Sequence, residues 1–140
     1  MTAREVEQKL KKVHWLKKEI KAKERQLIEI ETAATHITAV LSQTKSQPTE
    51  MMSKPESYAI RSYELKVKIK EDTDDLVKQT KEAYRMIATL EDPAQRAILT
   101  DYHLNDIPIR KLEETYHYSD RQIYNIRHAG YQNISDNFRL

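Results

Sequence analysis

Apolar residues in the first ninety positions recur at intervals of three and four, and this spacing constrains the fold more than any other feature. The first series comprises Val6, Leu10, Val13, Leu16, Ile20, Leu27, Ile30, Ala34, Ile37 and Leu41. Such spacing places apolar side chains along one side of an α-helix. A helix from Arg4 to about Leu41 would be roughly 55–60 Å long at a rise of 1.5 Å per residue. It needs a partner to cover its apolar side.

A second series follows and provides that partner. It comprises Leu65, Ile69, Leu76, Thr80, Ala83, Tyr84, Ile87 and Leu90. The segment between the two series, about residues 43–55, contains Pro48 and Pro55 and lacks apolar periodicity, so we predict a loop there. Two long helices joined in this way are expected to form an antiparallel, coiled-coil-like hairpin over residues 1–91. Members of the second series lie seven apart, which also allows pairing with a second copy of the chain.

The composition favours long solvated helices over a sheet. The chain has one Gly and four Pro, and 33% of its residues are charged. The absence of Cys excludes disulfides and Cys-ligated zinc. No apolar run approaches the roughly 18 residues of a membrane helix, and the first residues lack the apolar core of a signal peptide. We therefore predict an all-α protein of the cytoplasm, without a membrane partner.

A second domain is predicted over residues 92–140. Asp92 can cap a new helix whose first turn accepts Pro93, and proline disfavours helical geometry at the residue before it. The first helix of this domain, residues 93–104, offers four side chains to a small core: Ile98, Leu99, Tyr102 and Leu104. The domain is not basic: residues 92–140 hold six Lys or Arg against seven Asp or Glu.

Two short helices with a tight turn between them are predicted within this domain. Pro108 stands at or near the start of the first helix, which ends near Tyr116. After a short turn, Ser119 is a strong N-cap, and Gln122 three residues later completes a capping box. This is the spacing of a helix-turn-helix, whose second helix enters the major groove of DNA.

The helix that begins at Ser119 has two different faces. At about 100° per residue, the packed face comprises Ile123, Ile126, Gly130 and Ile134, and the opposite face comprises Arg121, Asn125, His128 and Gln132. Gly130 is the only glycine, and we expect it to allow another helix to approach closely. Arginine suits the O6 and N7 acceptors of guanine, and asparagine suits N6 and N7 of adenine. The opposite face is therefore suited to reading bases.

The segment LEDPAQRAILTDYHLNDIPIRKLEETYHYSDRQIYNIRHAGYQNI resembles the region-4-like helix-turn-helix of sigma factors, and in particular the small regulators of this kind that bacteriophages and prophages encode. The resemblance covers about residues 90–137. It implies a sequence-specific transcriptional regulator in a bacterial host, with Asp120, Arg121 and Asn125 at the base-reading positions. The chain departs from the family pattern at Glu113, where a small residue is usual, and at His117, where the turn usually has glycine.

Further residues complete the candidate DNA interface. Gln122 and His128 are additional base-reading candidates, although the capping box competes for Gln122. Contacts to phosphates, which orient a protein without specifying sequence, are predicted for Arg110, Lys111, Tyr124, Arg127 and Gln132. Because counterion release dominates non-specific affinity, a single copy of this non-basic domain is expected to bind DNA weakly.

The expected partners are double-stranded DNA, a second copy of the chain through the helical hairpin, and RNA polymerase. Two other functions stay open: a small terminase-like subunit of a DNA-packaging motor, and a helical adaptor that docks on RNA polymerase. A lysine-rich run near the N-terminus either extends the DNA contact or forms a solvated helix face; it comprises Lys9, Lys11, Lys12, Lys17, Lys18, Lys21 and Lys23. The histidines are scattered and no phosphate-binding loop or zinc motif occurs, so we predict no enzymatic activity, metal or cofactor.

Overall fold

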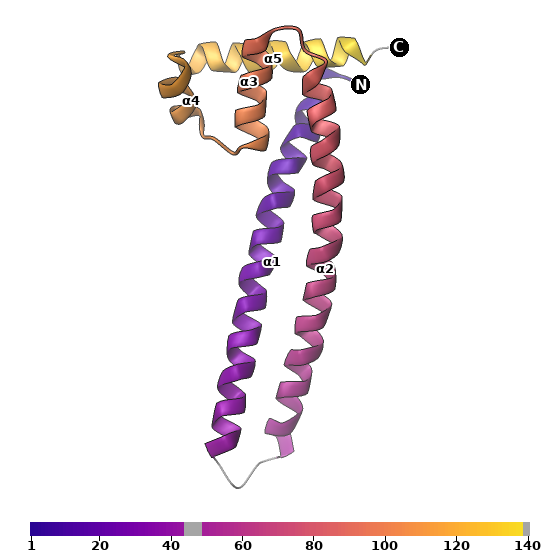
Figure 1. The fold of residues 1–140 in the computed structure, drawn as a ribbon, viewed down its shortest axis with the longest axis vertical. Helices are drawn as coiled ribbons and strands as arrows, with labels where there is room; N and C mark the ends of the chain where they lie inside the picture. The colour runs from indigo at the N-terminus through magenta and orange to yellow at the C-terminus, as the bar shows by residue number, and fades with distance from the viewer. Residues whose placement is uncertain (44–48, 139–140) are drawn as a thin grey trace. The chain divides into compact units, whose positions relative to one another are not determined.

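The computed structural model describes the backbone of residues 1–43 and 49–138, and the side chains of residues 1–36 and 56–138. The described residues form helices and no strands, which confirms the prediction of an all-α chain. The helices (Figure 1) are α1 (Ala3–Gln43), α2 (Thr49–Ala88), α3 (Pro93–Leu99), the π-helical turn η1 (Thr100–Leu104), α4 (Ile109–Tyr116) and α5 (Asp120–Asn137). Within the described ranges, no helix is both long enough and apolar enough to span a membrane.

The chain divides into two compact units that do not follow the predicted domains. Residues 1–17 and 76–140 form one, which we call the composite unit; residues 18–75 form the other, which we call the two-helix unit. The residues on both sides of the boundary predicted between 91 and 92 belong to the composite unit. A separate domain over residues 92–140 therefore stays a prediction. In the composite unit, these residues are grouped with the first turns of α1 and the last turns of α2.

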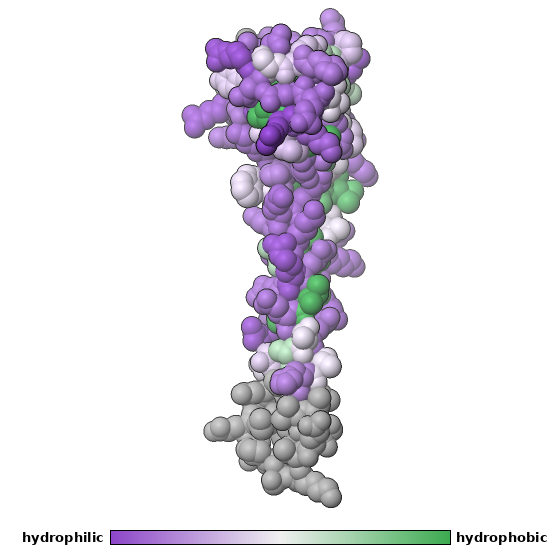
Figure 2. Space-filling model, turned by 90° about the vertical axis from the view of Figure 1, so that its left-hand side faces the viewer, coloured by the Kyte–Doolittle hydropathy of each residue, from purple (hydrophilic) through white to green (hydrophobic). Residues whose placement is uncertain are grey.

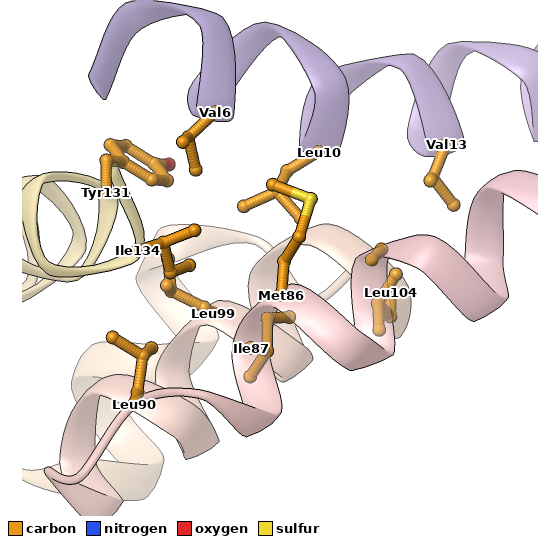
Figure 3. Close-up of a cluster of buried hydrophobic side chains, with 11 residues drawn as sticks. Val6, Leu10, Val13, Met86, Ile87, Leu90, Leu99, Leu104, Tyr131 and Ile134 are labelled. Atoms are coloured by element: carbon orange, nitrogen blue, oxygen red, sulfur yellow. The ribbon is translucent and has the colours of Figure 1, made fainter. Parts of the chain in front are cut away.

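The core of the composite unit draws on five helices (Figure 3). Its buried members are Val6, Leu10 and Val13 of α1; Ala83, Met86 and Ile87 of α2; Leu90; Leu99 of α3; Leu104 of η1; and Tyr131 and Ile134 of α5. The side chains of the two long helices point into the same cluster as those of the C-terminal helices. The start of α1 is thus part of the scaffold that supports α5.

One member of the predicted apolar series on α2 is wrong. Tyr84 is 52% exposed, whereas Met86, which the series omitted, is 2% exposed. The reason is the helical angle: Met86 lies three residues after the buried Ala83, which is about 60° around the helix, whereas Tyr84 lies about 100° away on the other side. The remaining described members of the series between Ala83 and Leu90 are buried as predicted.

In the two-helix unit, a narrow apolar seam is flanked by ion pairs. Ile20 and Ile30 are buried, each with 7% exposure. Lys23 binds Asp72 from the opposite helix, and Lys66 Nζ lies 3.2 Å from Glu31 Oε1. The hydrogen bond from Lys23 lowers the pKa of Asp72; burial opposes this effect, and the charges of Lys23 and Lys68 reinforce it. Asp72 is therefore an ionised partner of Lys23 on the opposite helix. No group of three or more His, Cys, Asp or Glu that could hold a metal ion occurs among the described residues.

The prediction of a loop over residues 43–55 is wrong from Thr49 onward. Residues 44–48 lie outside the described part of the chain, and α2 already begins at Thr49. The segment lacks an apolar stripe, and this pattern favours a loop. That absence removes a packing face, but polar residues can still form helix when they extend a long helix that is packed elsewhere. The side chains of Ile37 and Leu41, the last members of the first series, also lie outside the described residues.

Candidate nucleic-acid interface

Helix α4 and helix α5 are separated by a turn with well-defined caps. Pro108 has extended geometry (φ −67°, ψ 153°) and precedes the first residue of α4. His117 ends α4 in the left-handed region (φ 56°, ψ 37°), where glycine is usual. Ser119 Oγ then accepts a 3.2 Å hydrogen bond from Gln122 N, and Gln122 Oε1 accepts one of 2.8 Å from Ser119 N. The predicted capping box is confirmed.

A second small core joins the three C-terminal α-helices. Ile98 of α3, Leu112 of α4 and Ile123 of α5 are each fully buried in it. Partly buried apolar and aromatic side chains surround them, namely Tyr102, Ile107, Ile109, Tyr116, Tyr118 and Ile126. Because each helix contributes one fully buried anchor, the first turns of α5 are held against both α3 and α4.

The inner face of α5 packs closely on α3 at Gly130. A Cβ atom placed at Gly130 would lie 2.8 Å from Leu99 Cδ1 and 3.8 Å from Gln95 Cβ. A contact as short as 2.8 Å requires the neighbour to move, and Leu99 is fully buried. The expectation that Gly130 permits the close approach of another helix is confirmed.

The opposite face of α5 presents polar side chains. Asp120, Arg121, Gln122, Asn125 and Gln132 are all exposed. The Arg121 guanidinium lies 5.4 Å from the centre of the Tyr124 ring, which in turn lies 4.0 Å from the His128 ring. His128 is only partly exposed. The predicted base-reading residues thus share one helix, with Arg121 and Asn125 one turn apart near its start.

Four of the predicted phosphate-contacting residues are accessible. Arg110 and Lys111 are exposed in the first turn of α4. Tyr124 is 44% exposed, and Gln132 is exposed while its amide nitrogen donates a 3.1 Å hydrogen bond to Asp136. These side chains extend the polar surface from α5 onto α4.

Arg127 is not on that surface, so its predicted role as a phosphate contact is corrected. It is 6% exposed, its guanidinium lies 4.2 Å from the centre of the Tyr102 ring, and its Nε donates a 3.5 Å hydrogen bond to the Tyr131 hydroxyl. Arg127 lies four residues after Ile123 and seven before Ile134, so it belongs to the buried face. That spacing was a signal in the sequence which the positive charge of the side chain obscured.

A buried hydrogen-bonded group beside Arg127 was missed altogether. The ring of His103, which is 1% exposed, places Nε2 2.6 Å from the Tyr131 hydroxyl. The Tyr131 hydroxyl therefore forms hydrogen bonds with both Arg127 and His103. Burial, reinforced by the charge of Arg127, lowers the pKa of His103 to about 3. Burial raises the pKa of Tyr131 to about 12, although Arg127 opposes this.

A carboxylate of α1 lies close to the same region. Burial raises the pKa of Glu7, but the hydrogen bond and charge of Lys11 and the charges of His128 and Arg127 more than offset this, so its pKa falls below the ordinary value. Glu7 is therefore ionised near the middle of α5. Its negative charge reduces the positive potential that Arg127 and His128 would otherwise give to this side of the helix.

Several lysines of the basic N-terminal run are engaged by acids. Lys9 Nζ lies 2.9 Å from Glu82 Oε1, and Lys11 Nζ lies 2.9 Å from Glu7 Oε1. Lys17 Nζ lies 3.5 Å from one oxygen of Asp106. These pairs favour the interpretation of the run as a solvated, charge-compensated helix face, and they leave less free charge for phosphate contacts.

Comparison with known proteins identifies no relative of the chain. No family model, curated protein or solved structure matches the chain. The resemblance to sigma region 4 accordingly rests on the sequence motif between residues 90 and 137 and stays a prediction.

Proposed function

We propose that this protein is a sequence-specific, double-stranded-DNA-binding transcriptional regulator that reads the major groove with α5. The observation that carries the proposal is the position of Arg121 and Asn125. Both are exposed, four residues apart, in the first turns of a helix whose start is held by a capping box and whose other face is buried. The helix-turn-helix is thereby the interpretation of α4, the turn and α5 that best fits the side chains they present.

The chemistry of the side chains decides which of them contact bases and which contact phosphates. Arg121 is suited to guanine and Asn125 to adenine, while Arg110 and Lys111 on α4 are suited to phosphates. The Arg121 guanidinium lies over the Tyr124 ring, and this contact limits the freedom of the arginine before it meets a base. A phage or prophage origin, action in the bacterial cytoplasm and a contact with RNA polymerase follow from the sequence resemblance alone.

Selection of bound sequences from a random pool of duplex DNA tests the proposal. We expect one enriched motif, and loss of about 30-fold or more in affinity for it when Arg121→Ala and Asn125→Ala are combined, because each good base contact is worth roughly 1–3 kcal/mol. Arg85→Ala removes an exposed positive charge from α2 and is the matched control. Equal affinity of the double variant and the control would contradict the proposal.

We further propose that the long helices form an antiparallel hairpin and that its two-helix unit mediates homodimerisation. The pairs Lys23–Asp72 and Glu31–Lys66 support the antiparallel arrangement, since residues that come later on α1 meet residues that come earlier on α2. Apolar side chains are left on the surface of α2: Ile60 is 54% exposed, Tyr63 70% and Val67 40%, at intervals of three and four. Figure 2 shows hydrophobic side chains, in green, on a mainly hydrophilic surface.

A dimer would compensate for the weak charge of each DNA-binding domain, because two linked contacts act at a high effective concentration. Replacing Tyr63 and Val67 together with Glu is expected to convert a dimer to a monomer in sedimentation experiments and to weaken DNA binding. Replacing the exposed Lys70 and Glu71 with Gln serves as the control. A wild-type mass of one chain would exclude the dimer, and a ring of about eight or more copies would favour the terminase-like alternative.

Two observations favour a helical adaptor instead. The ionised Glu7 beside α5 and the burial of Arg127 both reduce the positive potential expected of a DNA-binding surface. An adaptor would bind RNA polymerase through the same face without a preferred DNA sequence. Absence of any enriched motif, together with binding to purified polymerase that is lost in the Arg121 and Asn125 variant, would favour it.

A further inference from the structure

A cavity of about 390 Å³ in the composite unit is not used by the proposed DNA interface. Its lining residues are Lys11, His14 and Trp15 of α1 on one side, and Tyr102, His103, Asp106, Ile107 and Pro108 on the other. Its volume lies within the range of roughly 300–1,000 Å³ that is typical of small-molecule sites. Both walls belong to the same compact unit.

The walls of this cavity are rich in rings. Trp15 is 62% exposed, which is unusual for so large an apolar side chain. Its ring meets that of His14 edge to face at a centroid distance of 5.5 Å. On the other wall, the rings of Tyr102 and His103 meet at 4.8 Å, also edge to face. Flat aromatic surfaces favour a planar aromatic occupant, which would cover part of the exposed indole.

The polar groups of the cavity favour a negative charge on that occupant. Asp106 already has partners within the unit: its Oδ1 lies 2.6 Å from His14 Nδ1, and its Oδ2 forms an ion pair with Lys17 Nζ at 3.5 Å. Lys11 is half-exposed, and its ammonium lies 2.9 Å from Glu7 Oε1, one turn earlier on the same helix. The ammonium keeps further donors with which to bind an anion, since lysine has three N–H donors.

We propose that this cavity binds a small planar aromatic carboxylate, with the ring against Trp15 and Tyr102 and the carboxylate at Lys11. Asp106, Ile107 and Pro108, which line one side of the cavity, lead directly into α4. Asp106 in that segment has a positive φ of 56° and is held to α1 by His14, so an occupant contacts the joint between α1 and α4. Occupancy of the cavity requires no DNA, and its test is therefore independent of the proposed function.

The emission of Trp15, the only tryptophan of the chain, reports on occupancy directly. Benzoate is the probe, with excitation at a wavelength that benzoate does not absorb. We expect a saturable change in Trp15 emission. Cyclohexanecarboxylate, which lacks the aromatic ring, and benzyl alcohol, which lacks the charge, should each bind about tenfold more weakly. Absence of a saturable change with benzoate, or equal affinities for the three probes, would overturn the proposal.

Two variants on the same helix locate the carboxylate. Lys11→Gln should weaken benzoate binding about tenfold and leave binding of benzyl alcohol unchanged. Lys12→Gln, which removes an exposed charge that does not line the cavity, should alter neither. Circular dichroism verifies that both variants keep their helix content. Should Lys11→Gln unfold, Lys11→Met is measured in its place with the same expected result. Benzoate binding as tight as in wild type in the folded Lys11 variant, or an equal loss in Lys12→Gln, would overturn the assignment of the carboxylate to Lys11.

Discussion

The composite unit and the two-helix unit each contain parts of α1 and α2, yet these helices bury their side chains differently in the two units. In the composite unit, side chains from five helices converge, and Val6, Leu10 and Leu99 have no exposed surface. In the two-helix unit, only one seam is available, so Ile20 and Ile30 keep 7% exposure while Ile28 stays 62% exposed. The number of converging elements, rather than the apolar content of either helix, decides how much surface is removed from water.

Polar groups divide in the same way. The composite unit buries His103 and Arg127 and satisfies them through Tyr131 and Tyr102. The two-helix unit keeps its charges near the surface in pairs such as Glu31–Lys66. Changing one member of a buried polar network lowers the free energy of unfolding considerably, whereas breaking an exposed ion pair lowers it little. The contrast between the units can therefore be measured with matched substitutions.

The largest effect is expected from a truncation in the composite core. Leu10→Ala should lower the free energy of unfolding by about 3 kcal/mol, because Leu10 is fully buried among α1, α2 and α5. Leu27→Ala, at a partly buried position of the two-helix unit, should lower it by about 1 kcal/mol. Urea denaturation monitored by circular dichroism measures both. Equal losses would remove the distinction between the units.

Acid should destabilise the composite unit through His103. Its pKa is about 3 in the folded chain and about 6.5 when unfolded, so the unfolded state binds the proton first as pH falls. Stability is complete above pH 6.5 and declines between there and about pH 3. At pH 4.5 the loss should be about 2–3 kcal/mol. His103→Gln, which removes the titrating ring, should abolish this part of the pH dependence; an unchanged profile would contradict the assignment.

A smaller effect is expected where α5 meets α3. Gly130→Ala should gain about 1 kcal/mol of helix propensity and lose more through the contact with Leu99, for a net loss of about 1 kcal/mol. In a Leu99→Ala background the new methyl group has room, so the same substitution should become stabilising. Thermal or urea unfolding of the wild type and the three variants in this cycle gives the sign of the effect. A stabilising effect in both backgrounds would show that the approach of α3 does not require glycine.

The smallest effect is expected in the two-helix unit. Lys66→Gln breaks the pair with Glu31, but both side chains are about half exposed, so the loss should be less than about 0.5 kcal/mol and should shrink further in high salt. Arg61→Gln is a control without an acidic partner among the described residues. A loss above 1 kcal/mol that persists in high salt would mean that this unit depends on its ion pairs more than its exposure indicates.

Local features of the chain were predictable because they depend on residues close together in sequence. The helical periodicity of α1, the cap at Asp92 and the capping box of Ser119 and Gln122 are examples. Gly130 was also identified correctly, because the only glycine of the chain falls on an apolar helix face. The start of α2 was predicted less well, since a polar segment without periodicity fits either a loop or an unpacked stretch of helix.

Tertiary packing decided the rest, because burial depends on which segments meet. The helical angle of Arg127 places it on the inner face, where the ring of Tyr102 and the hydroxyl of Tyr131 compensate for its burial. His103 became a neutral buried group for the same reason, and Glu7, 96 positions before His103, came to lie near α5. The sequence by itself determined the helices and their caps; only the convergence of α1, α2 and the C-terminal helices determined which charges stay on the surface, since desolvation is set by neighbours distant in the chain.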